Sequence, residues 1–334
     1  MTRIVPIISA GALGPMLDWM AVSDARAAER LAARDLAWVA GHPPECPVPL
    51  LPAVSLLVDL ARAHGPDLPC RTAQARGIFQ LGPLGMQALV AGTVGGAVRA
   101  IAAAMPRHCT NEMITVEADG AGLVVRDLWS LTFDDDVTVH AVQQYVAAIF
   151  LSLFRLGAEK EAPPVRISIR PHPEAGLAHL LPWFGETVGP PASGTLALSV
   201  PSALASSTLP KPPVAAGPSA DWPRLRTDDT LAGSVRHLLR SMLGTDTPTI
   251  DRMAGYARMS RRSFQRRLAD EGTSFSALLD EARRHHAIER AGHADGSLAA
   301  LSSDLGYAGQ ASLSRAFRRW TGAPPSRFGR SSAG

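Results

Sequence analysis

Apolar residues recur at helical spacing along most of the chain, which predicts a largely helical protein. In the first half this spacing predicts helices over residues 23–39, 53–65, 94–105 and 138–156. Thr93 is placed to cap the third of these helices, and Gly65 to end the second. Residues 1–20 are interrupted by glycine, proline and aspartate, so we expect a loosely structured lead-in to a helix and no signal peptide or membrane span.

The spacing changes to alternation in the stretch EMITVEADGAGLVVRDLWSL, residues 112–131. Apolar and polar residues alternate on both sides of Asp119-Gly120, a pair that is favoured in tight hairpin turns. RISIR at 166–170 and TLALSV at 195–200 predict two more strands. Residues 1–208 are therefore expected to form an α+β domain, in which several helices pack on a small antiparallel sheet.

The last third of the chain is predicted to be entirely helical. A proline-rich stretch over residues 209–227 has almost no apolar periodicity, so we expect an interdomain linker there. Residues 228–330 are expected to form an all-α domain, with two pairs of helices separated by one long helix. The helices are predicted within residues 229–244, 249–257, 260–272, 275–292, 297–306 and 308–322.

Positive charge is concentrated in the same third. Residues 231–330 contain 16 Arg, no Lys and 9 Asp or Glu, a net charge of +7, whereas the rest of the chain carries −4. This asymmetry is typical of a surface that binds phosphate groups. The charge is guanidinium, which can form two parallel hydrogen bonds to a phosphate or a guanine. A composition of 46% hydrophobic and 19% charged residues excludes a disordered chain.

The stretch SRRSFQRRLADEG, residues 260–272, predicts a helix with one buried face and one basic face. Ser260 is a favoured N-cap, and Phe264 and Leu268 lie four positions apart, so both can pack on a core. Arg and Gln side chains then project from the other side near the helix start. In a helix-turn-helix this part enters the major groove, where Arg can pair with guanine and Gln with adenine. A solvated basic helix fits the stretch equally well when it is taken alone.

A weaker copy of this pattern follows further along the chain. AxxMSRRSFQRRL and LGYAGQASLSRAF place similar polar residues around two apolar positions, and Arg266 and Arg315 are 49 residues apart. A solvated surface helix gives no reason for the duplication. Two reading helices joined by a rigid helix can contact successive segments of the major groove, so the repeat favours DNA binding.

The run from residue 249 to 328 resembles the DNA-binding domain of AraC/XylS-type transcriptional regulators, above all in SLAALSSDLGYAGQASLSRAFRRWTGAPPSRF. More loosely, FQLGPLGMQALVAGTVGGAVRAI, the hairpin and VPSALASSTLP resemble the arabinose-binding-type regulatory domain of a subgroup. The resemblance implies a cytoplasmic, dimeric regulator, with activation as one mode, that binds double-stranded DNA and can meet RNA polymerase. It further implies that the N-terminal domain binds a small-molecule effector or mediates self-association. No enzymatic activity, cofactor or membrane association is implied.

The resemblance also assigns roles by position. The residues that would read bases are Arg262, Gln265 and Arg266 in the first reading helix, and Gln310, Ser314 and Arg315 in the second. The residues that would contact the DNA backbone are Arg261, Arg267 and Arg318. The effector-binding residues are left unassigned.

Four positions depart from the family pattern. Arg258 stands in the first turn where Gly is usual, and Ala257 replaces a usual Leu. In the second pair, Ser302 replaces a small apolar residue and Gly309 takes a cap position where Ser or Asp is common. These departures predict that the first helix dominates base specificity and that the second acts more as a backbone clamp.

Catalytic and metal-binding interpretations have little support. The three cysteines are widely spaced and are expected to be reduced, buried thiols. Adjacent helical residues point about 100° apart, so His285 and His286 cannot share a metal. His172 and His179 flank a loop without an acidic partner at ligand spacing. The run 134–136 of three Asp is expected to be a polar loop, and Trp183-Phe184 to be core.

Two other classes of function remain open at this point. One is a ligand-blind regulator that oligomerises and binds DNA. The other is a small-molecule-binding protein or an enzyme whose basic C-terminal region is incidental. Base-specific DNA binding would separate both kinds of regulator from a small-molecule-binding protein or an enzyme. A screen of metabolites would separate the effector-controlled regulator from the ligand-blind one.

Overall fold

The structure is a computed structural model that describes residues 4–73, 77–157, 164–211, 222, 224–225, 228–291 and 298–325. The chain divides into two compact units, Pro6–Arg226 and a second formed by Met1–Val5 with Thr227–Gly334. We call them the N-terminal unit and the C-terminal unit. Most of the predicted linker, the Ser297 cap and the end of the predicted DNA-binding domain lie outside the described residues.

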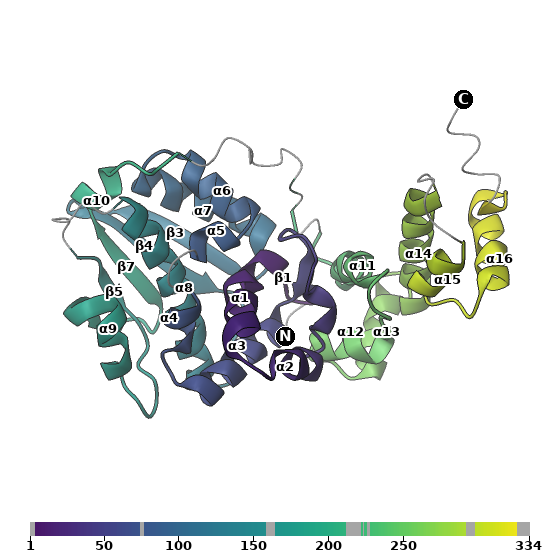
Figure 1. The fold of residues 1–334 in the computed structure, drawn as a ribbon, viewed down its shortest axis with the longest axis horizontal. Coiled ribbons are helices and arrows are strands. Elements are labelled where there is room, and N and C mark those ends of the chain that lie inside the picture. The colour runs from purple at the N-terminus through teal and green to yellow at the C-terminus, as the bar shows by residue number, and fades with distance from the viewer. Residues whose placement is uncertain are drawn as a thin grey trace. The chain divides into compact units, whose positions relative to one another are not determined.

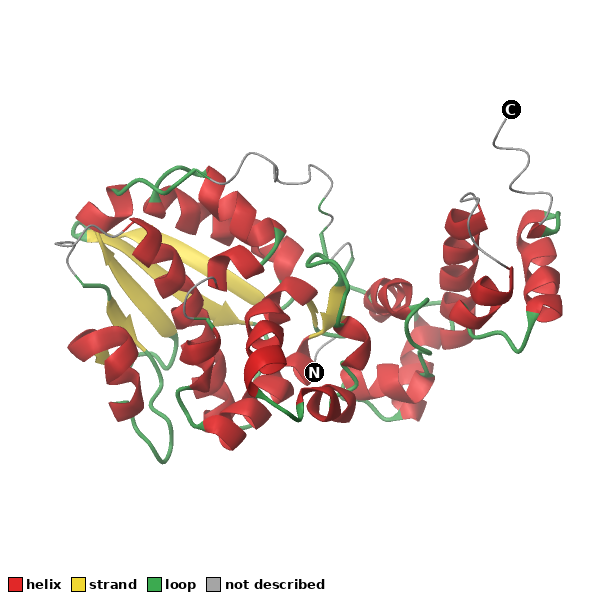
Figure 2. Cartoon of the chain, in the orientation of Figure 1, coloured by secondary structure: helices red, strands yellow, loops and turns green. Residues whose placement is uncertain are grey.

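The N-terminal unit combines helices with a five-stranded sheet (Figures 1 and 2). Its strands are β1 Ile7–Ser9, β2 Pro47–Pro49, β3 Glu112–Ala118, β4 Gly122–Trp129, β5 Arg166–Ser168, β6 Val188–Gly189 and β7 Leu196–Pro201. Its helices are α1 Gly14–Ser23, α2 Ala27–Ala33, α3 Leu50–His64, α4 Leu68–Thr72, α5 Gly77–Gln80, α6 Pro83–Val90, α7 Val94–His108, α8 Asp136–Gly157, α9 Leu181–Phe184 and α10 Ser202–Ser206.

The sheet has the strand order β3-β4-β7-β5-β6. The predicted hairpin forms β3 and β4 in the register Val116 with Val125, and Gly120 adopts the positive φ of 80° that its turn requires. β4 pairs with β7 and β7 with β5, both antiparallel, whereas β5 and β6 run parallel. The expectation of a purely antiparallel sheet is therefore wrong at this one edge, where the short β6 was not predicted.

Helices α7 and α8 pack against the sheet. Thr93 caps α7 as predicted, because its Oγ1 accepts a hydrogen bond from Gly96 N at 3.1 Å. α8 is the one described helix that is long and apolar enough to cross a membrane, but 72% of its apolar window is buried inside the protein. That burial is typical of a core helix, so α8 forms part of the interior of this unit.

Two predictions for the start of the chain are wrong. Residues 23–39 do not form one helix, because Asp24 is extended and its carboxylate accepts hydrogen bonds from Arg26 N and Arg30 Nε at 3.0 and 2.7 Å. Asp35, at a positive φ of 56°, ends the following segment. The lead-in is not loose either, since β1 pairs with β2 and Leu13 is fully buried.

The C-terminal unit is all helical within its described residues. Its helices are α11 Leu231–Met242, α12 Ile250–Tyr256, α13 Arg261–Asp270, α14 Phe275–Ala291, α15 Leu298–Asp304 and α16 Gln310–Thr321. Val5, near the start of the chain, also belongs to this unit, and its amide donates a hydrogen bond to Ser234 Oγ at 3.0 Å. α14 contacts α11 and also α16, so it joins the two halves of the unit.

Candidate nucleic-acid interface

Helix α13 is fixed by one cap and two buried side chains. Ser260 is extended and its Oγ accepts a hydrogen bond from Ser263 N at 3.2 Å, so the helix begins at Arg261 as predicted. Phe264 and Leu268 are both 0% exposed. Their burial fixes the rotation of the helix, and the opposite face is therefore left to solvent.

The structure brings the three predicted base-reading residues of α13 together on that exposed face. Arg262, Gln265 and Arg266 are all exposed, and the two arginines make no ion pair with any described residue. Arg261 is exposed too but bonds to Asp251 Oδ2 at 3.2 Å. Arg267 is half-buried. Arg261 and Arg267, the residues predicted to contact the DNA backbone, thus lie beside the exposed face. The ion pair of Arg261 is exposed to solvent and therefore weak.

The turn before α13 adopts a backbone conformation that favours glycine. Arg258 has a positive φ of 52°, and the turn is closed by hydrogen bonds from Arg258 N to Gly255 O at 3.0 Å and from Met259 N to Ala254 O at 2.9 Å. A side chain in the left-handed region costs about 1–2 kcal/mol. Arg258, which stands where the family usually has Gly, is therefore a strained residue in the turn that sets the direction of α13.

The end of α13 is attached to the start of α11 by a contact that the sequence did not reveal. Glu271 follows the helix, and its carboxylate accepts hydrogen bonds from Leu231 N and Ala232 N at 2.9 and 2.8 Å. These amides belong to the first turn of α11, where backbone donors lack helical partners and the helix dipole favours a negative charge. Local spacing gives no signal for this contact because 40 residues separate the two groups.

Helix α16 repeats the arrangement with a weaker start. Gly309 precedes it without a side-chain cap, whereas Leu313 and Phe317 are 0% exposed and pack with Leu305. Among the predicted residues of this helix, Gln310, Arg315 and Arg318 are exposed and Ser314 is half-buried. Arg315 Nη2 donates to Ser312 Oγ at 3.1 Å, so its guanidinium lies along its own helix.

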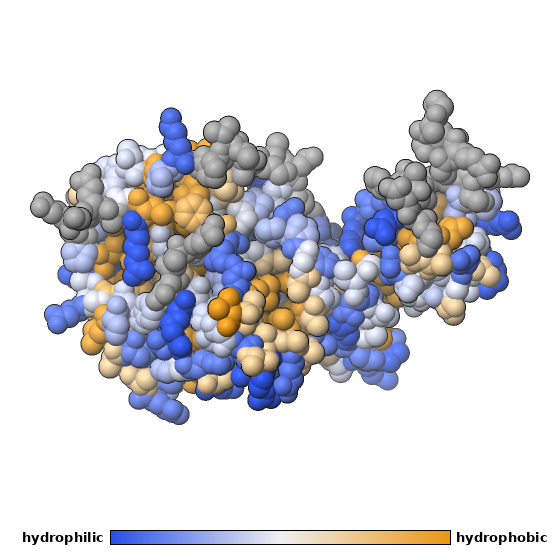
Figure 3. Space-filling view, viewed as in Figure 1, coloured by the Kyte–Doolittle hydropathy of each residue, from blue (hydrophilic) through white to orange (hydrophobic). Residues whose placement is uncertain are grey.

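Two adjacent carboxylates on α14 hold the unit together. Glu281 bonds to Arg236 of α11 at 2.9 Å, and Asp280 accepts hydrogen bonds from Arg319 and Trp320 of α16 at 2.6 and 2.9 Å. The long helix therefore contacts a helix of each half through neighbouring positions. On the visible face of this unit, hydrophilic side chains lie on both sides of a smaller apolar region (Figure 3).

Three histidines lie together in the N-terminal unit. His140, which the sequence analysis did not single out, lies with His179, and their Nε2 atoms are 3.0 Å apart. His140 Nδ1 donates to Arg170 O at 2.6 Å, and burial lowers the pKa of His140 to about 4. His172 stacks edge-on against both rings. Among the described residues, no three His, Cys, Asp or Glu side chains are placed to hold a metal ion.

The remaining candidates have structural roles. His285 bonds to Glu289 at 3.0 Å, while burial and then the charge of Arg290 lower the pKa of the neighbouring His286. Asp135 accepts a hydrogen bond from Thr138 N at 2.7 Å at the start of α8. Phe184 is buried and Trp183 is half-exposed. All three cysteines are free and buried, as expected.

Comparison with known proteins identifies the C-terminal unit. Residues 253–331 match the family described as "Helix-turn-helix domain". Together with the capped, basic helix α13, this match shows that the chain carries a DNA-binding helix-turn-helix domain of the AraC type. The match covers less than half of the chain, so it says nothing about residues 6–226.

Several regulators share this part of the sequence. An uncharacterized HTH-type transcriptional regulator of Mycobacterium tuberculosis is 42% identical over 96 residues, which is 28% of each chain. The HTH-type transcriptional regulator VqsM of Pseudomonas aeruginosa is 40% identical over 81 residues, 24% of this chain and 25% of that one. The matching region thus spans less than a third of either relative.

One solved structure aligns over nearly the whole chain. The transcriptional regulator CdpR of Pseudomonas aeruginosa covers 94% of this chain and 98% of its own, at 19% identity and a TM-score of 0.40. This likeness is too low to carry an argument. The arabinose-binding-type character of the N-terminal unit therefore stays a prediction.

Proposed function

We propose that the protein is a sequence-specific transcription regulator that binds double-stranded DNA through α13 and α16. The observation that carries the proposal is the exposed row Arg262, Gln265 and Arg266 on a helix whose other face is fully buried. Guanidinium and amide groups there can form paired hydrogen bonds to guanine and adenine. Because α13 lies inside the helix-turn-helix match, the major groove is the natural site for that face.

The two helices would divide the work unequally. α13 begins at a Ser cap and exposes three base-reading candidates, whereas α16 begins at an uncapped Gly309 and holds Arg315 along its own surface. We therefore assign base discrimination mainly to α13. Gln310, Ser314 and Arg315 contribute less to it, and Arg318, Arg261 and Arg267 bind phosphates.

The N-terminal unit would supply the control. It contains an apolar cavity, which supports binding of a small effector, and it is the candidate for self-association into a dimer. Two-fold symmetry would then be expected in the DNA site. A cytoplasmic protein that meets RNA polymerase at the promoter completes the proposal. The alternative is a regulator that oligomerises and binds DNA without any ligand.

A DNA selection with the purified chain tests the base-reading assignment. After the site is found, Gln265→Ala or Arg266→Ala is expected to relax the preference at one base pair by about 1–3 kcal/mol and to leave the other positions unchanged. Arg318→Ala should weaken binding to all sequences and reduce the salt dependence. Arg284→Ala, which removes an exposed charge from α14, is the matched control. Equal losses on selected and random DNA would contradict base reading by α13.

A further inference from the structure

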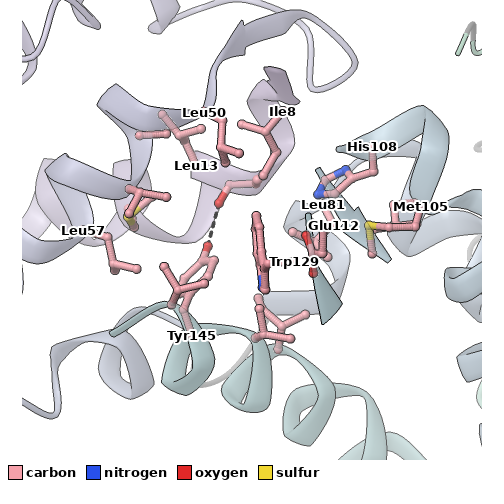
Figure 4. Close-up of a pocket in the computed structure, with 18 of the residues that line it drawn as sticks. Ile8, Leu13, Leu50, Leu57, Leu81, Met105, His108, Glu112, Trp129 and Tyr145 are labelled. Carbon is pink, nitrogen blue, oxygen red and sulfur yellow. Dashed lines mark hydrogen bonds between the residues drawn. The ribbon is translucent and has the colours of Figure 1, made fainter. Parts of the chain in front are cut away.

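An apolar cavity of about 90 Å³ lies inside the N-terminal unit (Figure 4). Its walls include residues of β1, α3, α7 and α8, among them Ile8, Leu57, Ile101, Ile149 and Phe150. The volume is below the ~150 Å³ of an apolar protein cavity that admits benzene. The cavity therefore suits a short alkyl chain rather than an aromatic ring.

Four lining side chains can form hydrogen bonds, and two of them are already satisfied. Tyr145 OH donates to Ala12 O at 2.7 Å. Trp129 Nε1 donates to Asp127 Oδ2 at 2.9 Å, behind the cavity wall. In Figure 4 the Trp129 indole stands in the middle of the site and Tyr145 on one side. Neither donor is left for a ligand.

The other two, His108 and Glu112, are drawn on the same side of the Trp129 indole (Figure 4). His108 is 4% exposed and its Nδ1 has no hydrogen-bond partner. Glu112 leads into β3, and register places it on the same sheet face as Asp127, because Glu112 pairs with Trp129. Asp127 is buried as well, and its Oδ1 also lacks a partner. One end of the cavity thus holds a carboxyl group and an imidazole whose Nδ1 has no partner, and no Arg or Lys side chain is among the described lining groups.

Burial raises the pKa of both carboxyl groups at this end of the cavity. Burial, and then the Asp127 carboxylate, raise the pKa of Glu112 well above its usual range. Burial raises the pKa of Asp127 to about 7, while burial lowers the pKa of His108 to about 4 and keeps it neutral. Cys109 and Tyr145, the other titratable groups nearby, are also neutral because burial raises the pKa of each.

We propose that this cavity binds a small amine, whose alkyl body fills the apolar space and whose ammonium group donates to Glu112 and His108 Nδ1. An ammonium brings three N–H donors and a positive charge to a place where two buried carboxyl groups, Glu112 and Asp127, have no basic side chain beside them among the lining residues. The described lining residues include no Arg or Lys, so a carboxylate or an amino acid zwitterion finds no counter-charge. Binding exchanges charges in balance: Glu112 gives its proton to the buffer, and the ammonium takes its place.

The probes are n-butylamine, butanoate and 1-butanol, which share a body of similar size and differ in the polar end. Calorimetry of the full chain near neutral pH should show binding of n-butylamine and release of about one proton, seen as a heat that changes with the ionisation enthalpy of the buffer. Butanoate should not bind, and 1-butanol should bind about tenfold more weakly than the amine. Equal or tighter binding of butanoate or 1-butanol would overturn the assignment.

Glu112→Gln tests the acceptor without changing the shape of the site. The variant should fold, because it replaces a carboxyl that is protonated in the empty cavity. It is expected to weaken n-butylamine binding by about tenfold or more and to abolish proton release, with 1-butanol binding unchanged. Glu117→Gln, on the exposed part of the same strand, is the matched control and should behave as the unsubstituted protein. Unchanged amine binding in Glu112→Gln would refute the proposal.

The inference rests on the proposed function only in taking the amine to be an effector. DNA affinity measured by anisotropy on the same preparations separates the two. A chain that binds DNA but not n-butylamine refutes the amine site and keeps the regulator. A chain that binds the amine with proton release but shows no specific DNA binding supports the site and refutes the regulator.

Discussion

Replacing Glu271 with Ala should loosen the junction between α13 and α11. The Glu271 carboxylate accepts hydrogen bonds from two backbone amides in the first turn of α11, those of Leu231 and Ala232, at 2.9 and 2.8 Å. The next amide of that turn, from Gly233, is bonded to Thr230 Oγ1 instead. Glu271 therefore supplies hydrogen-bond acceptors for two backbone amides that have no carbonyl partner within the helix.

The magnitude follows from these contacts. A hydrogen bond to a charged group contributes about 1.5–3 kcal/mol, and a charge at a helix start about 0.3–1 kcal/mol more. Water can replace part of this, since Glu271 is half-buried, but Leu231 is 0% and Ala232 7% exposed. We therefore expect the free energy of opening α11 to fall by about 2–3 kcal/mol. Glu271→Gln keeps one acceptor oxygen and should lose about half of that.

Hydrogen exchange of the full chain, read at the amides of α11, measures this loss directly. A loss of about 2–3 kcal/mol corresponds to exchange faster by roughly 30- to 150-fold. Asp270→Ala is the matched control, because it removes an exposed carboxylate from the last position of the same helix. The reasoning is refuted if the Asp270 variant accelerates exchange in α11 as much as the Glu271 variant, or if neither variant does.

Three further substitutions test other features of the two units. Ser302→Ala should stabilise the C-terminal unit by about 1–2 kcal/mol in urea unfolding, because the hydroxyl is 2% exposed without a partner, whereas the exposed Ser303→Ala should have no such effect. Arg258→Gly should stabilise it by about 0.5–1 kcal/mol through relief of the positive φ of 52°, net of the flexibility of glycine, and Arg258→Ala should not. Since burial raises the pKa of Asp127 to about 7, its contribution to stability is present at low pH and is lost as pH rises through 7, so the N-terminal unit should lose about 1 kcal/mol between pH 6.5 and 8. Asp127→Asn should flatten that slope in thermal unfolding, and an unchanged slope would contradict it.

The predictions that hold rest on signals carried by neighbouring residues. Thr93 and Ser260 cap α7 and α13 because a side-chain oxygen three positions before an amide can reach it in any protein. The hairpin turns at Asp119-Gly120 for an equally local reason. The spacing of Phe264 and Leu268 likewise predicts the buried face of α13.

The features that were missed depend on groups far apart in the chain. Pairing of β1 with β2 joins segments about 40 residues apart, and each strand is too short to show alternation. The extended conformation of Asp24 follows from its bonds to Arg30 as well as to its neighbour, in a stretch whose composition favours a helix. The contacts of Glu271 and Asp280 require the packed helices themselves. Sequence spacing therefore shows which face of a helix is buried, but not against what.

The same distinction decides which arginines of the C-terminal unit are free for DNA. A net charge of +7 for residues 231–330 does not separate arginines that stabilise the fold from those that bind a partner. The structure separates the two groups, because three arginines of this unit form ion pairs with carboxylates within 3.0 Å. They are Arg236, Arg252 and Arg319. Arg262 and Arg266 make no such contact with the described residues, although they are exposed and four positions apart on α13. Like charges at this spacing destabilise a free helix by about 0.2–0.5 kcal/mol. Neither arginine forms an ion pair with a described carboxylate, whereas phosphates and guanine edges would satisfy both, so the unpaired arginines favour α13 as the DNA-reading surface.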